Sequence, residues 1–293
     1  MESEFNLSLM GLDNLEYLQT KNTIKINLTR PPSDKTISQH TNHQTDVSGH
    51  YGYYFREGVA LFEFIEGHEI RVSPMTNTFD EDFFRVLLNY PMACLLYQQG
   101  YFLLHASAVE FREKVYLFPG PSLCGKSTLA AYLVKHGGKL ITEDTAAIAI
   151  TDQGAFISPS YPLIKLSGPA NKYIGLGKSS GINFPRDNNA RKGHLLSSTS
   201  FVCKPKKIDF CIFPEWGSSG GVLEKLSFSL AIGNLMLSSQ SSVSLDRSKE
   251  KRLLSANARF LKNVSAYAYK REQSFLSLES LIKDLEALQG QTV

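Results

Sequence analysis

One stretch of the sequence has the residue types and the spacing of a phosphate-binding loop. Glycines stand at positions 120 and 125, and Lys126 and Ser127 follow the second glycine directly. Glycine lets the backbone turn tightly and aim its N–H groups at an anion. In such loops the lysine ammonium reaches the β- and γ-phosphates of a nucleotide, and the hydroxyl binds Mg²⁺. The predicted ATP-binding residues are Gly120, Pro121, Ser122, Leu123, Cys124, Gly125, Lys126, Ser127 and Thr128.

Two adjacent carboxylates, Glu143 and Asp144, are the nearest candidates for a reacting centre. Phosphoryl transfer needs a group that accepts the proton of the attacking hydroxyl, and it needs a ligand for the metal. The pair interrupts an otherwise apolar stretch, which favours a function over the alternative, a surface acidic pair at a turn. Because side chains alternate along a strand, we expect only one of the two to face the γ-phosphate.

A histidine and a cysteine also lie where chemistry is possible. His105 interrupts the apolar stretch at residues 103–109. A lone histidine in a strand is usually a hydrogen-bonded core residue, and a catalytic role is the second interpretation. Cys124 lies inside the loop, where a small side chain whose amide matters is favoured over redox control.

The elements around the loop must hold these side chains together. Apolar patterns predict strands over residues 103–111, 115–118 and 139–150, and a helix over 127–136 that ends at two glycines. Strand, loop, helix and strand in this order is the context that a phosphate-binding loop requires. The carboxyl ends of parallel strands open onto one crevice, so we expect the loop and the acidic pair to face each other.

The region before the loop is predicted to be rich in strands. The pattern predicts a strand over residues 23–29, a polar loop over 30–49 and two or three strands within 51–72. Acidic residues at 80–82 suit the start of a helix, which Pro91 breaks or kinks. A further helix is predicted near the end, over 277–288.

A soft boundary near residue 79, or somewhat later, follows from this change of pattern. It divides the chain into a β-rich N-terminal region, residues 1–79, and an α/β catalytic domain, residues 80–293. The N-terminal region is the natural place for acceptor recognition, because the core around the loop is already assigned to nucleotide binding. Aromatic residues at 51 and 53–55 offer a contact surface there, and packing of a small β core is an equally good interpretation.

The bulk composition excludes several classes of protein. The net charge is only +3, so electrostatics indicate neither nucleic acid nor a membrane as the partner. No apolar run reaches the about 20 residues of a transmembrane helix, and the first residues lack a signal-peptide pattern. Four scattered cysteines are too few for a disulfide framework. We therefore expect a cytoplasmic protein, and its oligomeric state stays open.

Four stretches of the sequence resemble the HPr kinase/phosphorylase-like proteins, a P-loop branch related to the phosphoenolpyruvate carboxykinases. They are residues 104–109, 117–130, 139–144 and 158–163, and the strongest likeness covers about residues 102–166. The resemblance implies an α/β core of that type. It also implies a kinase that transfers the γ-phosphoryl group of ATP to a serine hydroxyl.

The same resemblance implies a role for each residue of the predicted centre. His105 would help to position the phosphate and the catalytic carboxylate, and Asp144 would accept the proton. Ser127 would hold Mg²⁺ together with Asp144, and a basic residue after position 185 would contact phosphate. The implied catalytic residues are His105, Lys126, Glu143, Asp144 and Arg191.

The sequence departs from the bifunctional enzymes of that family in two places. Its acidic pair begins with Glu143, where those enzymes have aspartate, and their Arg-Gly-rich signature is absent near residues 162–168. These features resemble the short HPr-kinase-like proteins, including lasso-peptide kinases that phosphorylate the C-terminal serine of a precursor. We therefore expect a peptide or protein serine as the acceptor. A nucleotide-dependent binding module without transfer is the alternative function, and simple triphosphate hydrolysis is a third.

Overall fold

The protein forms two compact units. The computed structural model describes residues 24–30, 45–47, 50–76, 79, 81–177, 183–184, 191–217, 221–239 and 247–290. The first unit ends at Leu103, and the second comprises Leu104–Ser239 and the chain from Arg247 onward. Within the described residues, every helix is too short or too polar to cross a lipid bilayer. The predicted boundary near residue 79 falls inside the first unit, and the predicted recognition role of residues 1–79 stays a prediction.

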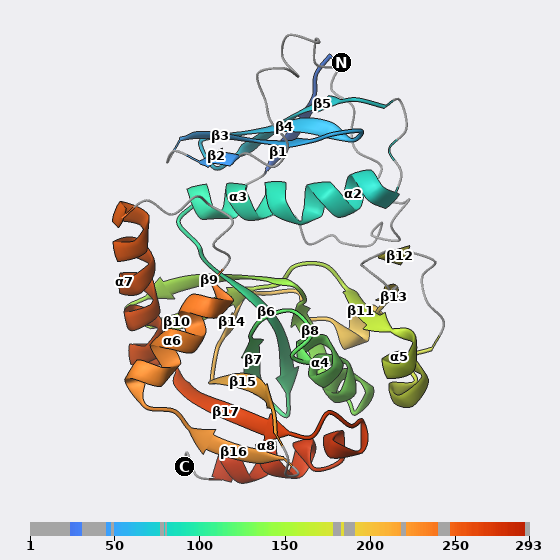
Figure 1. The fold of residues 1–293 in the computed structure, drawn as a ribbon, viewed down its shortest axis with the longest axis vertical. Helices are drawn as coiled ribbons and strands as arrows, with labels where there is room; N and C mark the ends of the chain where they lie inside the picture. Colours follow the sequence, from blue (N-terminus) through green and yellow to red (C-terminus); the bar gives the residue numbers. More distant parts are fainter. Residues whose placement is uncertain are drawn as a thin grey trace. The chain divides into compact units, whose positions relative to one another are not determined.

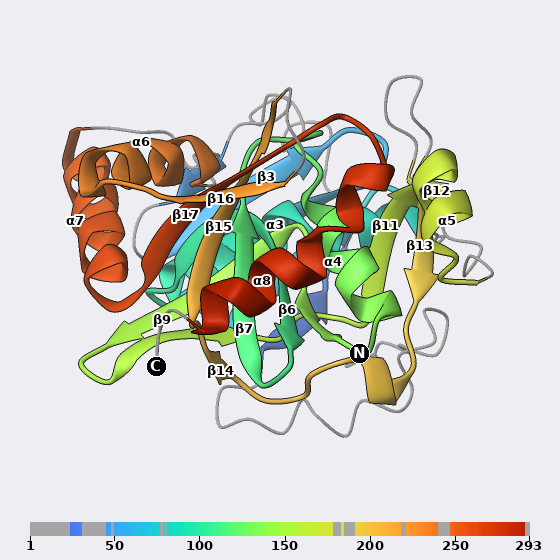
Figure 2. The same ribbon diagram turned by 90° about the horizontal axis from the view of Figure 1, so that it is seen from below.

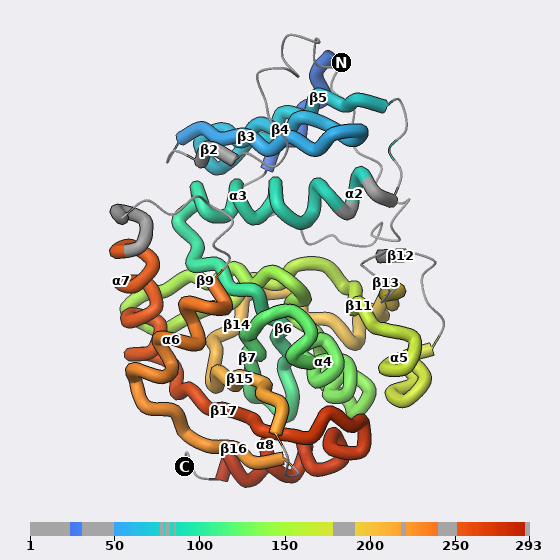
Figure 3. Tube along the Cα trace, in the orientation of Figure 1, coloured from blue at the N-terminus to red at the C-terminus, as the bar shows by residue number. Residues whose placement is uncertain are grey.

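The first unit contains a five-stranded sheet. Its strands are β1 (Lys25–Leu28), β2 (Thr45–Val47), β3 (Tyr51–Arg56), β4 (Ala60–Ile65) and β5 (Glu69–Pro74). Figure 3 shows β1 lying beside β5, with which it pairs in parallel although the two are far apart in the sequence. The strand predicted over 23–29 and the strands within 51–72 are confirmed. Residues 45–47 pair as β2 within the predicted polar loop, and residues 31–44 and 48–49 of that loop lie outside the described residues.

Two helices cover one face of this sheet, α2 (Glu81–Leu88) and α3 (Tyr90–Gln98) (Figure 1). Aromatic and aliphatic side chains fill the space between, among them Phe62 and Phe64 of β4 and Phe83 of α2. The predicted break at Pro91 is confirmed, because α2 ends at Leu88 and a new helix begins at Tyr90. Proline is tolerated in the first turn of α3, where its missing N–H would have no partner.

The second unit is built on a nine-stranded mixed sheet. Its strands are β6 (Phe102–Phe111), β7 (Lys114–Pro119), β8 (Lys139–Thr142), β9 (Thr145–Thr151), β10 (Gly154–Ser158), β14 (Lys206–Lys207), β15 (Phe210–Trp216), β16 (Val222–Lys225) and β17 (Ser265–Arg271). They follow the order β14-β10-β9-β6-β7-β15-β17-β16, and β8 pairs with β6 off this path. The mixed α/β class that the sequence predicts is confirmed.

Strand direction brings four strand ends to one edge of this sheet. Strands β7, β15 and β17 run parallel to one another. Strand β6 runs antiparallel to both β7 and β8, so β8 points the same way as β7. The carboxyl ends of β7, β8, β15 and β17 therefore lie at the same edge, where open α/β sheets bind their ligands.

The remaining elements flank this sheet. A three-stranded sheet has the order β11-β13-β12, made by β11 (Leu163–Ser167), β12 (Asn183–Phe184) and β13 (Arg191–Leu195). The helices are α4 (Lys126–Lys135), α5 (Gly168–Ile174), α6 (Phe228–Ser238), α7 (Arg247–Asn263) and α8 (Leu281–Gly290), with 3-10 turns η3 (Ser198–Ser200) and η4 (Leu276–Leu278). The helix predicted over 277–288 is thus divided into η4 and α8.

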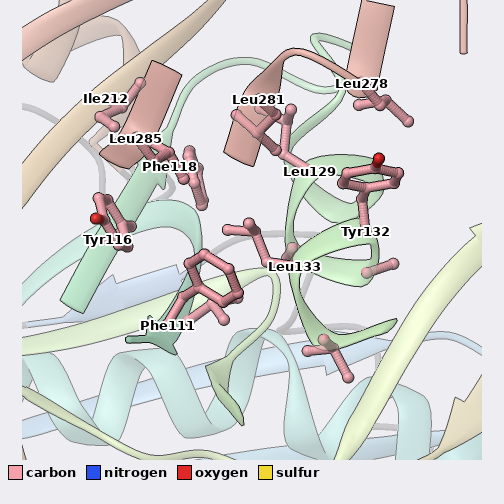
Figure 4. Packing of buried hydrophobic residues seen from close by; sticks show 14 of the residues in the cluster. Phe111, Tyr116, Phe118, Leu129, Tyr132, Leu133, Ile212, Leu278, Leu281 and Leu285 are labelled. Carbon is pink, nitrogen blue, oxygen red and sulfur yellow. The ribbon is translucent and has the colours of Figure 1, made fainter. Parts of the chain in front are cut away.

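Helices α4 and α8 pack on one face of the large sheet, in front of its strands in Figure 2. Figure 4 shows Phe118 of β7 between Leu285 of α8 and Leu129 of α4, with Tyr116 of β7 in the same cluster. All four side chains are fully buried, and burying one such side chain stabilises the fold by about 1.5–3 kcal/mol. This packing fixes the start of α4, and with it the loop that precedes α4.

Candidate functional site

The loop between β7 and α4 has the backbone geometry of an anion site. Strand β7 ends at Pro119, and α4 begins at Lys126 behind Gly125, which adopts a left-handed φ of 97°. A Cβ atom at Gly125 would lie 2.6 Å from Nη2 of Arg271, so only glycine fits there. The first N–H groups of a helix have no partner inside the helix, so the start of α4 can offer donors to an anion.

A cleft of about 410 Å³ opens at this loop. Its lining combines residues of the loop with residues from the ends of several strands. They are His105, Ser122, Leu123, Gly125, Lys126, Ser127, Thr128, Glu143, Asp144, Lys165, Leu166, Ser167, Ala170, Arg191, Trp216, Arg271, Gln273, Ser274 and Phe275. Every predicted catalytic residue lies in this lining. Of the predicted ATP-binding residues, Gly120, Pro121 and Cys124 lie outside it.

Lys126 is buried at the base of the cleft. Only 5% of its surface is exposed, and its Nζ donates a hydrogen bond to the carbonyl of Pro121 at 2.6 Å. Burial lowers the pKa of Lys126, because the charged ammonium loses hydration. The lysine therefore lies against the loop's own backbone, beside the space that its predicted phosphate partner would occupy.

The acidic pair lies at a turn, which corrects the prediction of one continuous strand over 139–150. Strand β8 ends at Thr142, β9 starts at Thr145, and Asp144 between them has a left-handed φ of 77°. The alternation expected along a strand is therefore lost at this point. Both Glu143 and Asp144 line the cleft, and the expectation that only one of them faces the γ-phosphate stays a prediction.

Lys165 is one of the cleft residues that sequence reasoning missed, together with Trp216 and Arg271. It stands on β11, and its Nζ lies 2.7 Å from Oδ2 of Asp144 and 3.5 Å from Oε2 of Glu143. Burial alone would lower the pKa of Lys165, but Glu143, Tyr161 and Asp144 together outweigh it and raise that pKa. The lysine thus stays charged. Its signal in the sequence is a cation that interrupts the apolar run at 163–166.

Glu143 is the most deeply buried carboxylate of the cleft, with 2% of its surface exposed. Burial raises its pKa above the ordinary value, and the nearby Lys165 ammonium opposes that shift. One carboxylate oxygen accepts a hydrogen bond from Oγ of Ser127 at 2.6 Å. The other has no hydrogen-bond partner among the described residues. Ser127 therefore lies beside Glu143, while Asp144 lies beside Lys165.

Oxygen atoms of this kind suit magnesium. The ion prefers hard oxygen ligands, and proteins commonly supply one or two side chains while phosphates and water supply the rest. One Glu143 oxygen already lies against the Ser127 hydroxyl at the start of α4, and the other, which is 3.5 Å from Lys165 Nζ, accepts no hydrogen bond from the described residues. The residues present fit a Mg²⁺ ion. The role of Asp144 as a metal ligand stays a prediction.

His105 connects the acidic turn with the loop. Its Nδ1 lies 2.9 Å from the carbonyl oxygen of Asp144 and 3.3 Å from the carboxylate of the same residue. A carbonyl can only accept, so Nδ1 carries the proton, and Nε2 faces Oγ of Ser122 at 3.5 Å. Burial lowers the pKa of His105, which favours the neutral ring. The ring therefore holds Asp144 through its backbone and side chain.

The structure describes two of the three basic residues that could contact phosphate after position 185. The contact itself stays a prediction. Arg191, at the start of β13, lines the cleft. Lys192 is exposed and stands outside the lining. Arg186 lies outside the described residues.

The aromatic residues of β3 divide between packing and exposure. Phe55 is buried, and Tyr54 lies against Phe62 and Tyr90 with ring centroids 6.3 and 4.7 Å apart. Tyr51 stays 42% exposed, and its hydroxyl donates to Glu63. Packing therefore accounts for Tyr54 and Phe55, and a role of this strand in acceptor recognition stays a prediction.

No protein-family model and no curated protein matches the sequence. Among solved structures, the chain is similar to the HPr(Ser) kinase/phosphatase from Coxiella burnetii, with 11% sequence identity and a TM-score of 0.34. The match covers 65% of this chain and 97% of that chain. A likeness at this level carries no conclusion about activity, so the proposals below rest on the residues of the cleft.

Proposed function

We propose that the cleft is the active site of an ATP-dependent kinase that transfers the γ-phosphoryl group to a serine hydroxyl of a peptide or protein. One observation supports this proposal most strongly. Asp144 lies in the same cleft as Lys126 and the start of α4, within hydrogen-bond reach of both Lys165 and His105. A phosphate site and a positioned proton acceptor are the two parts that phosphoryl transfer requires.

The loop and Lys126 bind the phosphates in this proposal. The free N–H groups at the start of α4 and the positive end of its dipole attract the anion. The Lys126 ammonium exchanges its bond to the Pro121 carbonyl for phosphate oxygens. Arg191 adds a second positive charge to the wall of the cleft.

Asp144 accepts the proton of the acceptor serine. The serine oxygen forms a bond to the γ-phosphorus, the bond from that phosphorus to the β,γ-bridging oxygen breaks, and ADP leaves. The Lys165 ammonium at 2.7 Å favours the ionised form of Asp144, which is the form that accepts a proton. His105 fixes the position of the carboxylate through its two contacts with the same residue.

Ser127 and Glu143 would hold Mg²⁺, through the hydroxyl and carboxylate oxygens that already lie 2.6 Å apart. When bound, the ion neutralises charge that develops on the phosphate oxygens. The two carboxylates of the turn thus receive different tasks, Glu143 on the metal and Asp144 on the proton.

Mass spectrometry of a synthetic peptide library tests the proposal. The library carries serine, threonine and tyrosine at internal and C-terminal positions, and it is incubated with the protein and Mg-ATP. We expect phosphate on serine, and none after chelation of Mg²⁺ or in Lys126→Ala. Lys135→Ala, at the opposite end of the same helix, is the matched control and should retain the activity.

Three other outcomes would contradict the proposal. Binding of ATP without any modified peptide would favour the nucleotide-dependent binding module. Release of phosphate to water alone would favour simple hydrolysis. Equal phosphorylation by Lys126→Ala would move the chemistry away from this cleft.

A further inference from the structure

The strand order places two groups of cleft residues on opposite sides of β7, the strand that precedes the phosphate-binding loop. On one side, β6 carries His105, and the turn after β8 carries Glu143 and Asp144. On the other side, β15 and β17 run parallel to β7 and end at Trp216 and Arg271. The two end residues stand opposite each other in the register of β15 and β17, and both line the cleft. The proposed chemistry uses no residue of the second flank.

Trp216 and Arg271 form a stacked pair against the loop. The Arg271 guanidinium carbon lies 4.4 Å from the centroid of the Trp216 ring. The far edge of the indole lies 3.3 Å from the position that a Cβ atom would take at Gly125. One face of the ring is thus covered by the guanidinium and one edge touches the loop, yet 41% of the residue stays exposed.

Arg271 is held rigidly and bears an uncompensated charge. It is 2% exposed, and Nη1 donates to the Ser277 hydroxyl at 3.1 Å and to the carbonyls of Glu272 and Ser274. Within the described residues no carboxylate forms an ion pair with it, and its Nε lacks a hydrogen-bond partner. A cationic plane behind an indole forms a flat, preorganised surface, and both residues of the pair line the cleft.

From this arrangement we infer that Trp216, backed by Arg271, is the platform on which the base of the bound nucleotide stacks. The inference rests on the proposed nucleotide site, because the phosphates must occupy the loop for the base to reach the platform. An exposed indole beside a phosphate loop suits a flat, aromatic heterocycle, since every base offers a π-face to it. Stacking alone does not distinguish bases, so the platform should serve ATP and GTP alike.

The chain offers a direct readout, because Trp216 is its only tryptophan. The intrinsic fluorescence of the whole protein therefore reports on the platform. Titration with Mg-ATP or Mg-GTP should quench the emission, whereas titration with magnesium tripolyphosphate, which has phosphates and no base, should leave it nearly unchanged.

Calorimetry of variants separates the base from the phosphates. In Trp216→Leu we expect the Kd for Mg-ATP and Mg-GTP to rise about tenfold, and the Kd for magnesium tripolyphosphate to stay at the wild-type value. Trp216→Phe, which keeps an aromatic face, should recover most of the affinity. Phe228→Leu removes another exposed aromatic side chain, which lies outside the cleft, and should bind all three ligands as the wild type does.

Each contrary result has one meaning. Wild-type affinity for ATP in Trp216→Leu would overturn the platform and leave the proposed kinase intact. An equal loss for ATP and tripolyphosphate would also overturn it, because the pair would then support the loop and not the base. Failure of the wild type to bind either ligand would overturn both the platform and the proposed nucleotide site.

Discussion

At the scale of single residues, the cleft is organised by three charged groups that share one small volume. Lys165 lies between Glu143 and Asp144, and it is nearly buried. Two carboxylates this close would repel each other if no cation stood between them. The lysine therefore offsets part of this repulsion, although burial still raises the pKa of Glu143.

Removal of this cation should destabilise the protein. Lys165→Met keeps the length of the side chain but leaves two carboxylates without their partner. We expect the free energy of unfolding to fall by about 3 kcal/mol, because breaking a buried pair leaves an uncompensated charge. Urea denaturation with an unchanged m-value measures the loss.

A second substitution supplies the control for that prediction. Glu143→Gln removes one of the charges that Lys165→Met leaves unpaired, so the double variant should recover on the order of 1 kcal/mol or more of the loss. If the two effects simply add, the three groups are not coupled, and the account of the cleft's charge balance is wrong.

Residues of this cleft differ in how far the sequence predicts them. The loop residues have fixed spacing, and His105 and the acidic pair stand out because each interrupts an apolar stretch of the sequence. Lys165 interrupts an apolar strand in the same way, but no local spacing connects it to Asp144. Trp216 and Arg271 meet only because β15 and β17 pair in parallel, a long-range contact that no local pattern predicts.

At the scale of elements, the loop depends on a glycine that two neighbours enclose. Gly125 combines a left-handed φ with contact to Arg271 and Trp216. A side chain there would strain the backbone and also displace the guanidinium. The loop therefore packs closely against the ends of β15 and β17 at Gly125.

Gly125→Ala should weaken nucleotide binding. Gly177 is the matched control, because its φ of 96° is nearly the same and nothing lies within 4 Å of an added Cβ. Both substitutions should cost about 1 kcal/mol or more of stability through backbone strain. Only Gly125→Ala should raise the Kd for Mg-ATP, by about tenfold or more, since only it displaces Arg271. Wild-type affinity in Gly125→Ala would contradict the fit between loop and strands.

The turn between β8 and β9 shows why one element was predicted wrongly. Apolar residues continue on both sides of the acidic pair, and that pattern is typical of a single strand. The break depends on the left-handed backbone of Asp144, a conformation that aspartate tolerates better than most residues. Neither glycine nor proline marks it.

At the scale of the whole molecule, the predicted class and most elements near the loop agree with the structure, because each is specified by local pattern. The mixed sheet is different. Its order places the acidic turn on one flank of β7 and the stacked pair on the other, and it depends on pairings between distant segments. The wholly parallel arrangement that would be simplest for such a loop is not adopted, since β6 runs antiparallel to its neighbours.

Nucleotide binding should stabilise the whole folded protein. At a Mg-ATP concentration of 100 times its Kd, linkage predicts a gain of about 2.7 kcal/mol in the free energy of unfolding. A gain of that size raises Tm by about 2–4 °C for each kcal/mol in a unit of this size. Calorimetric scans with Mg-ATP should show this rise in Tm for the wild type and for Lys135→Ala. They should show no rise in Tm for Lys126→Ala. A rise of equal size in Lys126→Ala would place the nucleotide elsewhere.

The central claim is that Asp144 accepts the proton during phosphoryl transfer, and Asp144→Asn tests it most directly. Asparagine has nearly the same shape and tolerates the left-handed backbone at this position, so the variant should fold and bind Mg-ATP with the wild-type Kd. The measurement is the rate at which labelled γ-phosphate passes from ATP to a serine peptide. We predict a rate about 10²–10⁴-fold below that of the wild type, the usual contribution of a general base. A rate equal to that of the wild type would contradict the account.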